Sequence, residues 1–366
     1  MPHASSAFGR GSVEGLKFVT NQHQPAAPPH CGAAVVSEAR ALEWAVRLGA
    51  KSWVSARPNP PVGCVVLTRS GKCVGYGRHT SPGEPHAEVV ALQMAGSQSK
   101  DSTVVVTLEP CNHHGRTPPC TERILKSGVR RVVYATKDPN PAAEGGSDFL
   151  KHHGIDVEHV PHRLADRLNA PHVTWSMKSR PHVIAKWAQS PEGNMCPPPT
   201  HGQWISSVRS RMEVHRIRGR VDAVLTGMGS VIADDCLLSP RNHKRRQTPL
   251  IAVASRSRSL PPTARVLENP SVELITEGNP LDQLKALQRL GAHVVLLEAG
   301  PRLLHAYWKA NLIDEAWIFV GPKPMPDGTG RSPVPSPEKR LRGHPKGFTM
   351  DLGPDRLYQI PIESKG

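Results

Sequence analysis

The chain has 366 residues, and its 46 Lys and Arg exceed its 31 Asp and Glu to give a net charge of +15, which favours an anionic partner without distinguishing a nucleic acid from a small phosphate ester. Seven Cys at irregular spacing argue against a disulfide framework and fit a reducing compartment. Since there is no apolar run of about 18 residues and no signal-peptide pattern, we expect a cytoplasmic protein with no membrane partner.

Residues 1–36 are rich in Gly, Pro, Ala, Ser and His without a sustained hydrophobic period, which predicts a disordered N-terminal extension. A hydrophobic fraction of 38% over a chain of this length is sufficient for two domains. The first domain is predicted over 37–162, where helical and strand patterns alternate as in an α/β layer. Its expected elements are a helix over 38–48 behind Ser37, a hairpin over 62–77, a helix over 87–95, a strand over 103–107, a helix over 121–126 and a strand over 131–135.

A domain boundary is predicted near residues 160–181, where a helix-like segment at 163–168 leads into a new strand pattern. The second domain is predicted over 180–363 and again alternates, so it is also α/β. Its expected strands lie at 182–188, 223–227, 250–254, 293–297, 315–320 and 357–360, and its expected helices lie at 206–218, 281–290 and 301–311. Residues 321–347, rich in Pro, Gly, Lys and Arg, are expected to form a mobile loop.

The chemistry of the first domain is indicated by His86 and Glu88, which are followed later by Cys111 and Cys120. One imidazole and two thiolates are zinc ligands of a kind that leaves a fourth tetrahedral position for water. Zinc lowers the pKa of bound water, and a neighbouring carboxylate such as Glu88 moves the proton from water to the departing amine. The pattern therefore predicts a zinc-dependent hydrolytic deaminase.

Two features of this motif qualify the interpretation. The usual signature ends in C-x-x-C, whereas here eight residues separate Cys111 from Cys120, and Cys111 is expected at a second helix start that favours its thiolate. His113 and His114 are not taken as ligands, because a fourth protein ligand would close the site. We expect them to face the substrate or the solvent.

Four longer motifs, at 59–65, 83–89, 107–120 and 138–141, resemble the deaminase half of the bifunctional riboflavin biosynthesis family RibD. The resemblance implies a three-layer cytidine-deaminase-like fold. It also implies activity on 2,5-diamino-6-ribosylamino-4(3H)-pyrimidinone 5′-phosphate. By the same resemblance, His86, Cys111 and Cys120 bind zinc and Glu88 is the proton donor.

The second half is similar to the reductase half of the same family, which has a dihydrofolate-reductase-like fold. The motifs that carry this likeness lie at 186–190, 203–206, 226–235, 238–241 and 298–301. The resemblance implies that NADPH is the cofactor and that it contacts Ala188, Trp204, Ser230, Asp234 and Gly300. It implies that the substrate contacts Gly202, Arg218, Leu238, Arg241 and Glu298.

The residue types agree with these implied roles. Arg218 and Arg241 are suited to bidentate pairing with a ribose phosphate, and Gly300 precedes an expected helix whose amides suit a cofactor phosphate. The sequence also departs from the family pattern at four positions. Glu192 replaces an Asp, Gly202 a Ser that touches substrate, Cys236 a Pro, and Ala254 an Asp.

Three functions remain open on the sequence. The first is a bifunctional enzyme that deaminates a phosphorylated pyrimidine and then reduces its ribosyl chain. The second is a deaminase whose reductase-like half has lost activity. The third, a nucleic-acid base deaminase, is disfavoured because only four Tyr and five Phe are available to interleave with basic residues. We therefore expect a small-molecule partner and no nucleic acid, and the sequence leaves a homo-oligomer open.

Overall fold

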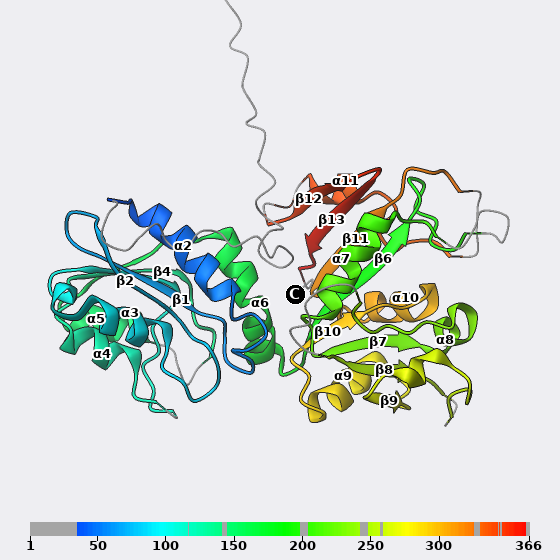
Figure 1. The fold of residues 1–366 in the computed structure, drawn as a ribbon, viewed down its shortest axis with the longest axis horizontal. Helices are drawn as coiled ribbons and strands as arrows, with labels where there is room; N and C mark the ends of the chain where they lie inside the picture. The colour runs from blue at the N-terminus through cyan, green and yellow to red at the C-terminus, as the bar shows by residue number, and fades with distance from the viewer. Residues whose placement is uncertain are drawn as a thin grey trace, which may run out of the picture.

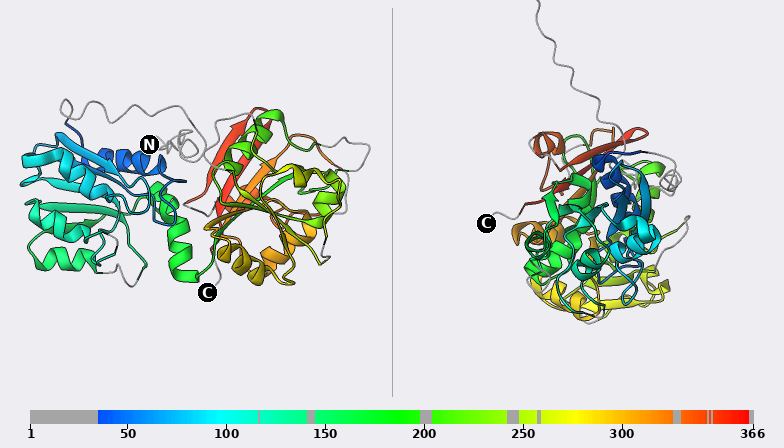
Figure 2. Two further views of the ribbon diagram at one scale, coloured as in Figure 1. Left: turned by 60° about the horizontal axis from the view of Figure 1, so that its bottom comes forward. Right: turned by 90° about the vertical axis from the view of Figure 1, so that its left-hand side faces the viewer.

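The computed structural model describes residues 35–115, 117–140, 145–197, 204–241, 248–256, 259–325, 330–342, 344 and 346–363. They form two sheets, each covered on both faces by helices, with helix α6 (Arg163–Lys178) between the two units (Figures 1 and 2). The predicted α/β class is therefore confirmed. Most of the predicted extension 1–36 lies outside the described residues, although Val36 N–H donates to Gly71 O at 2.9 Å.

The first sheet has five strands in the order β2-β1-β3-β4-β5. Its strands are β1 (Gly63–Leu67), β2 (Cys73–Arg78), β3 (Thr103–Leu108), β4 (Arg131–Thr136) and β5 (Asp156–His159). Strands β1 and β2 form the predicted antiparallel hairpin, and β1 also pairs antiparallel with β3. Strands β3, β4 and β5 run parallel. The parallel strands end together beside the loops that carry the sequence motifs.

Helices on both faces of this sheet make three layers. The helices are α2 (Glu38–Ala50), α3 (Ala87–Ala95), η2 (Gly96–Ser99), α4 (Cys120–Lys126) and α5 (Gly146–His152). Because side chains alternate along a strand, Val104 and Val106 pack in the core beneath α3, α4 and α5, whereas Val105 packs with α2 and α6. This burial on both faces explains the continuous apolar run of β3.

Capping residues and strand polarity explain which elements of this domain the sequence predicted and which it missed. Helix α2 begins behind Ser37, whose Oγ accepts from Arg40 N–H at 3.3 Å, as the capping pattern predicted. Strand β5 was missed because its polar residues lie at an exposed sheet edge. The prediction of a helix start at Cys111 is wrong, since α4 begins at Cys120 and Cys111 lies in the loop after β3.

The second sheet has eight strands in the order β12-β13-β11-β6-β10-β7-β8-β9. Its strands are β6 (His182–Gln189), β7 (Ala223–Gly227), β8 (Leu250–Ala254), β9 (Val272–Ile275), β10 (Val294–Leu297), β11 (Glu315–Val320), β12 (Phe348–Leu352) and β13 (Asp355–Pro361). Strand β13 pairs antiparallel with both β11 and β12, and the other pairs are parallel.

Helices again cover both faces of this sheet. They are α7 (Val208–Arg218), α8 (Met228–Asp234), η4 (Arg265–Glu268), α9 (Pro280–Arg289), α10 (Pro301–Lys309) and α11 (Pro337–Leu341). One core lies between the sheet and helices α9 and α10, and the other between the sheet and helices α7 and α8. Residues 321–347, expected to be a loop, contain helix α11, and strand β12 was not expected.

Helix α6 joins the two units and packs against both. In the first unit, Leu168 is buried in the core and Asn169 Nδ2 donates to Thr107 O at 3.1 Å. On the other side, Arg167 pairs with Glu315 of the second unit and lies 5.9 Å from the Trp317 ring. Only residues 163–168 of this helix were expected. Its later part was missed because Pro171 lies inside it, and a proline usually indicates the end of a helix.

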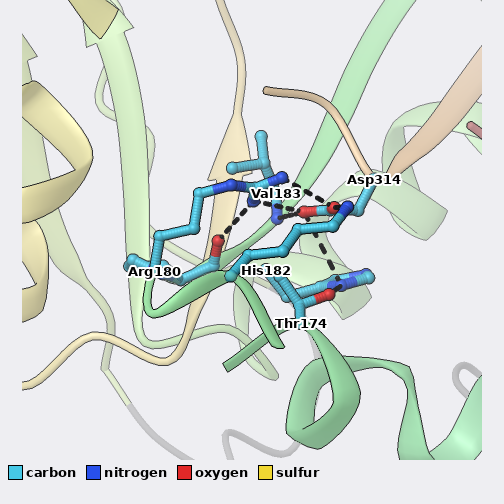
Figure 3. Close-up of polar contacts among 7 residues, drawn as sticks. Thr174, Arg180, His182, Val183 and Asp314 are labelled. Atoms are coloured by element: carbon cyan, nitrogen blue, oxygen red, sulfur yellow. Dashed lines mark hydrogen bonds and ion pairs between the residues drawn. The ribbon is translucent and has the colours of Figure 1, made fainter. Parts of the chain in front are cut away.

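The junction between α6, β6 and β11 is built around the buried carboxylate of Asp314 (Figure 3). Asp314 accepts from Arg180 Nη1 at 2.7 Å and Nη2 at 2.9 Å, and from Val183 N–H at 2.9 Å. Lys178 Nζ adds a contact at 3.0 Å. Burial alone would raise the pKa of Asp314, but the side chains of His182, Arg180 and Lys178 lower it to about 2. The folded protein therefore holds this carboxyl group in its ionised form.

We expect Asp314→Ala to lower the free energy of unfolding by about 3–5 kcal/mol, because Arg180 would stay buried without its counter-charge. Chemical denaturation measures this loss. The matched control is Asp351→Ala, which removes an exposed ion pair with Arg356 and should cost about 0–1 kcal/mol. Equal losses in the two variants would contradict the special role of Asp314.

The pKa of Asp314 also sets a pH dependence. Since it is lower in the folded state than the usual value of about 3.9, the carboxylate stabilises the fold fully above that pH. This stabilisation disappears as the pH falls towards 2. Unfolding midpoints measured from pH 6 to pH 2 should therefore fall more steeply for the wild type than for Asp314→Ala.

Candidate active sites

Helix α3 is brought close to the sheet by glycine in strand β2. A Cβ atom on Gly77 would lie 2.5 Å from Ala87 O, so any larger residue would push the start of α3 away. His86 is the N-cap residue of this helix, and Glu88 lies in its first turn. The close contact between strand and helix therefore determines where the imidazole and the carboxylate stand.

The three predicted zinc ligands converge. His86 Nδ1 lies 3.1 Å from Cys120 Sγ and 3.5 Å from Cys111 Sγ, and the three ligand atoms all lie within 4.8 Å of one another. A tetrahedral zinc ion with bonds of about 2.0–2.3 Å needs ligand atoms roughly 3.5 Å apart. The arrangement therefore fits a three-ligand zinc site, and it is the one group of this kind among the described residues.

The surroundings of Cys111 favour the thiolate that a metal needs. A hydrogen bond with Cys120 and a further one with His86 lower the pKa of Cys111. Cys120 is the first residue of helix α4, and its backbone N–H donates to Cys111 Sγ at 3.4 Å. The thiolate of Cys111 is thus stabilised by hydrogen bonds from the start of a helix to which it does not belong.

Glu88 stands beside this triad and is nearly closed off from solvent, with 4% of its surface exposed. Burial raises the pKa of its carboxyl group. The carboxyl group lines the same cavity as His86 and Cys111, and the cavity has a volume of about 400 Å³. A group that takes up and releases a proton is therefore placed where a substrate would meet the metal ligands.

The cavity wall includes residues that the sequence motifs did not identify. His113 lines the cavity, and His114 is exposed and lies 3.2 Å from Glu122, so both agree with the expectation that they face the substrate or the solvent. Helix α6 contributes a part of the wall that we did not predict: His172, Trp175 and Ser176. Their spacing of three and four residues places them on one face of a helix, and this was the only signal available.

The loops around Cys111 are held together by a buried carboxylate. Glu109 Oε2 accepts from Asp138 N–H at 3.3 Å, and its Oε1 accepts from Ser147 N–H at 2.9 Å. Beside them, a Cβ atom on Gly146 would lie 1.9 Å from Pro110 O, so this close approach requires glycine. These contacts tie the loops after β3 and β4 to the start of α5.

The second unit contains a buried cluster of charges at Glu298, directly after β10. Arg218 Nε donates to Glu298 Oε1 at 2.6 Å and its Nη2 to Oε2 at 2.8 Å, and Lys186 Nζ lies 2.7 Å from Oε2. Burial alone would raise the pKa of Glu298, but the charges of Arg218 and Lys186 lower it to about 2. Arg218 and Glu298 were expected as substrate contacts, whereas Lys186 was part of the 186–190 motif with no role assigned to it.

Arg241 belongs to the same neighbourhood. Burial, followed by the charges of Arg218 and Arg241, lowers the pKa of His215 to about 4. That imidazole is therefore neutral near pH 7. Two of the expected substrate contacts, Arg218 and Arg241, therefore lie near His215 on α7. Nothing in the sequence motifs indicated His215.

Two of the expected cofactor contacts also lie together. A Cβ atom on Gly300 would lie 3.6 Å from Ser230 Oγ, so helix α8 and the start of α10 face each other. Asp234 ends helix α8, and burial raises the pKa of its carboxyl group while the charge of Lys186 opposes the shift. The two expected groups of residues therefore meet near Lys186.

The remaining expected residues are more dispersed. Ala188 is half-buried on β6, and Leu238 is buried with a positive φ of 60°. Trp204 is 61% exposed, and the guanidinium of Arg211 lies 4.6 Å from its ring. Gly202 lies outside the described residues. Trp204 is thus on the surface, with one face covered by an arginine.

Family models match both halves of the chain. Residues 35–136 match the cytidine and deoxycytidylate deaminase zinc-binding region, and residues 181–349 match the RibD C-terminal domain. The first match contains all three converging ligands. The second contains the Glu298 cluster and most of the second sheet, which makes this half a reductase domain with a dihydrofolate-reductase-like fold.

Curated relatives match about four fifths of the chain. The riboflavin biosynthesis protein RibD of Aquifex aeolicus is 38% identical over 78% of this chain and 87% of its own length. The Escherichia coli protein of the same name is 34% identical over 81% of this chain and 90% of its own. The chain belongs to the RibD family. It is therefore a riboflavin biosynthesis enzyme that combines a deaminase domain with a reductase domain.

Solved structures of the RibD family agree with this membership. Acinetobacter baumannii RibD is 33% identical, covers 89% of this chain and 99% of its own, and gives a TM-score of 0.73. A Thermotoga maritima protein is 28% identical with the same coverage and a TM-score of 0.74. Separately, none of the described helices is both long and apolar enough for a membrane span.

We expect purified protein to contain one zinc ion per chain, as measured by elemental analysis. Cys111→Ala and Cys120→Ala should each lose the metal, because two ligands no longer complete the site. Cys73→Ala is the matched control, since Cys73 is a buried thiol of the core away from the triad. Full zinc retention in both ligand variants would rule out this site.

Proposed function

We propose that the chain catalyses two consecutive steps of riboflavin biosynthesis. The first is hydrolytic deamination of 2,5-diamino-6-ribosylamino-4(3H)-pyrimidinone 5′-phosphate, and the second is NADPH-dependent reduction of the ribosyl chain to ribityl. The observation that carries the first step is the convergence of His86, Cys111 and Cys120 beside buried Glu88. The Thermotoga maritima relative is described as a diaminohydroxyphosphoribosylaminopyrimidine deaminase and 5-amino-6-(5-phosphoribosylamino)uracil reductase, which supports both steps.

In the deaminase site, His86, Cys111 and Cys120 would hold the zinc ion. When bound, zinc activates water for attack on the amino-bearing carbon by lowering the pKa of that water. Glu88 accepts the proton that the water gives up and passes it to the nitrogen that leaves as ammonia. Glu88 lines the same cavity as His86 and Cys111, which supports this role of its carboxyl group.

In the reductase site, the residues around Ser230 and Gly300 fit a phosphorylated dinucleotide. Gly300 leaves open space beside Ser230 Oγ, and the nine-residue helix α10 begins directly after it with backbone N–H groups that suit a phosphate. We assign cofactor contacts to Ala188, Trp204, Ser230, Asp234 and Gly300. NADPH, when bound, supplies the hydride that reduces an imine-like carbon of the opened ribose.

The substrate of this second site would be held by the charged cluster. We assign substrate contacts to Gly202, Arg218, Leu238, Arg241 and Glu298. Arg218 and Lys186 keep Glu298 ionised and oriented, so its carboxylate suits hydrogen bonds from sugar hydroxyl groups. Arg241 supplies a cation for the ribose phosphate. The +15 charge then serves phosphorylated small molecules rather than a nucleic acid.

We expect Glu88→Gln to keep its zinc and to lose deamination by about two orders of magnitude or more, because the amide cannot move the proton. Product formation from the diaminopyrimidine ribotide measures the rate, and elemental analysis checks the metal. Reduction of the deaminated substrate by the same variant is the internal control. A Glu88→Gln protein that deaminates at the wild-type rate would refute the assigned proton shuttle.

We expect the wild type to oxidise NADPH only when the deaminated substrate is supplied or formed. Arg241→Ala should raise KM for that substrate, because a phosphate contact is lost, and Asp234→Ala should nearly abolish reduction. Absorbance of NADPH follows both variants. As a control, both variants should deaminate at the wild-type rate. If the wild-type protein deaminates but never oxidises NADPH, the proposed reductase activity is refuted and only the deaminase activity stands.

A further inference from the structure

Helix α6 forms part of the deaminase cavity, although it follows the deaminase motifs by many residues. His172, Trp175 and Ser176 line the cavity together with Glu88 and Cys111. Two observations indicate that this part of α6 could contact a substrate. One is an ion pair at His172, and the other is the set of contacts that hold the helix in place.

The ring of His172 is oriented by a buried carboxylate. Its Nε2 donates to Asp138 Oδ1 at 3.0 Å, and only 13% of the His172 side chain and 7% of the Asp138 side chain are exposed. Asp138 is itself held, since its N–H donates to Glu109 and its Oδ1 accepts from Asn140 N–H at 3.0 Å. This arrangement leaves Nδ1 of His172 on the side of the ring that faces away from Asp138.

The helix that carries His172 is held from both units. Asn169 donates to Thr107 O in the deaminase core, and Thr174 hydrogen-bonds His182 at 2.9 Å at the start of the reductase domain (Figure 3). The ring of Trp175 lies 3.9 Å, centroid to centroid, from that of His293. A side chain on such a support keeps its position when a ligand binds, as a specificity-determining residue requires.

The polar and charged residues that line the cavity indicate what His172 could bind. The described residues that line the cavity include four carboxylates and neither Lys nor Arg. The carboxylates belong to Glu84, Glu88, Glu109 and Asp138. Of the histidines other than the metal ligand, His79 already uses both ring nitrogens, one with Asn59 and one with Pro85 O. A wall with these groups suits donors such as the hydroxyl groups of a sugar, and Nδ1 of His172 is an acceptor that the described contacts leave for one of them.

We propose that Nδ1 of His172 accepts a hydrogen bond from a hydroxyl group of the ribosyl part of the deaminase substrate and that Asp138, which takes the Nε2–H bond, positions the ring for this contact. The inference rests on the deaminase function proposed above. The amino-bearing edge of the pyrimidine must lie at the metal ligands. Helix α6 lines the same cavity as His86 and Cys111, and we place it against the ribosyl part of the substrate.

The test uses steady-state deamination by the full-length zinc enzyme with the diaminopyrimidine ribotide. His172→Phe keeps the ring shape and removes both nitrogens, so KM should rise about tenfold while kcat changes less than about threefold. His172→Asn places an amide near the position of Nδ1, whereas His172→Gln places it near Nε2. His172→Asn should therefore retain the lower KM of the two.

Asp138→Asn tests the positioning role. It should raise KM because the ring of His172 is no longer fixed by a carboxylate, and the rise should be absent when His172 is already Phe. Additive effects of the two substitutions would show that Asp138 acts independently of His172 and would overturn this half of the proposal.

Controls separate this inference from a folding defect and from failure of the proposed function. His152→Phe makes the same chemical change at an exposed position on α5 and should leave KM unchanged. Each variant should keep one zinc ion and the wild-type rate of reduction. An unchanged KM in His172→Phe, or a fall in kcat alone, would overturn the proposal. A wild type that does not deaminate would instead refute the proposed function itself.

Discussion

Helix α6 packs into the hydrophobic core of the deaminase domain and is tied to the reductase domain by ion pairs and hydrogen bonds, and this double attachment constrains both halves of the chain. On one side Leu168 fills the deaminase core, and on the other Arg167 reaches Glu315 and the Trp317 ring of the reductase domain. A helix held from two sides cannot slide or rotate without exposing apolar surface or an unpaired charge. The position of the second domain is thereby coupled to the wall of the deaminase cavity.

The junction at Asp314 extends this constraint by electrostatics. One carboxylate accepts from Arg180, Val183 and Lys178, so the end of α6, the start of β6 and the start of β11 meet at a single group. Removing either charge from such a buried pair leaves the other uncompensated, whereas pairs at the surface cost little to break. The linker between the domains is therefore a structural element and not a flexible tether.

The two candidate sites use charge in opposite ways. In the deaminase, His86 and the two thiols gather around the space for one metal ion, and the carboxylates of Glu109 and Asp138 in the cavity wall are tied to backbone N–H groups or to His172. In the reductase, a buried carboxylate at Glu298 is held ionised by Arg218 and Lys186. The first arrangement suits proton movement beside a metal, and the second suits binding of a polar, phosphorylated substrate.

The sequence by itself predicted the α/β class and the three residues that converge in the structure, His86, Cys111 and Cys120, because strand burial and metal ligation impose residue types that are visible along the chain. Tertiary structure alone decided that α6 lines the first cavity and that Arg218 and Lys186 pair with Glu298. It also decided that α4 begins at Cys120 and not at Cys111. These facts depend on contacts between segments far apart in sequence, and local propensity carries no information about which distant surface a side chain will meet.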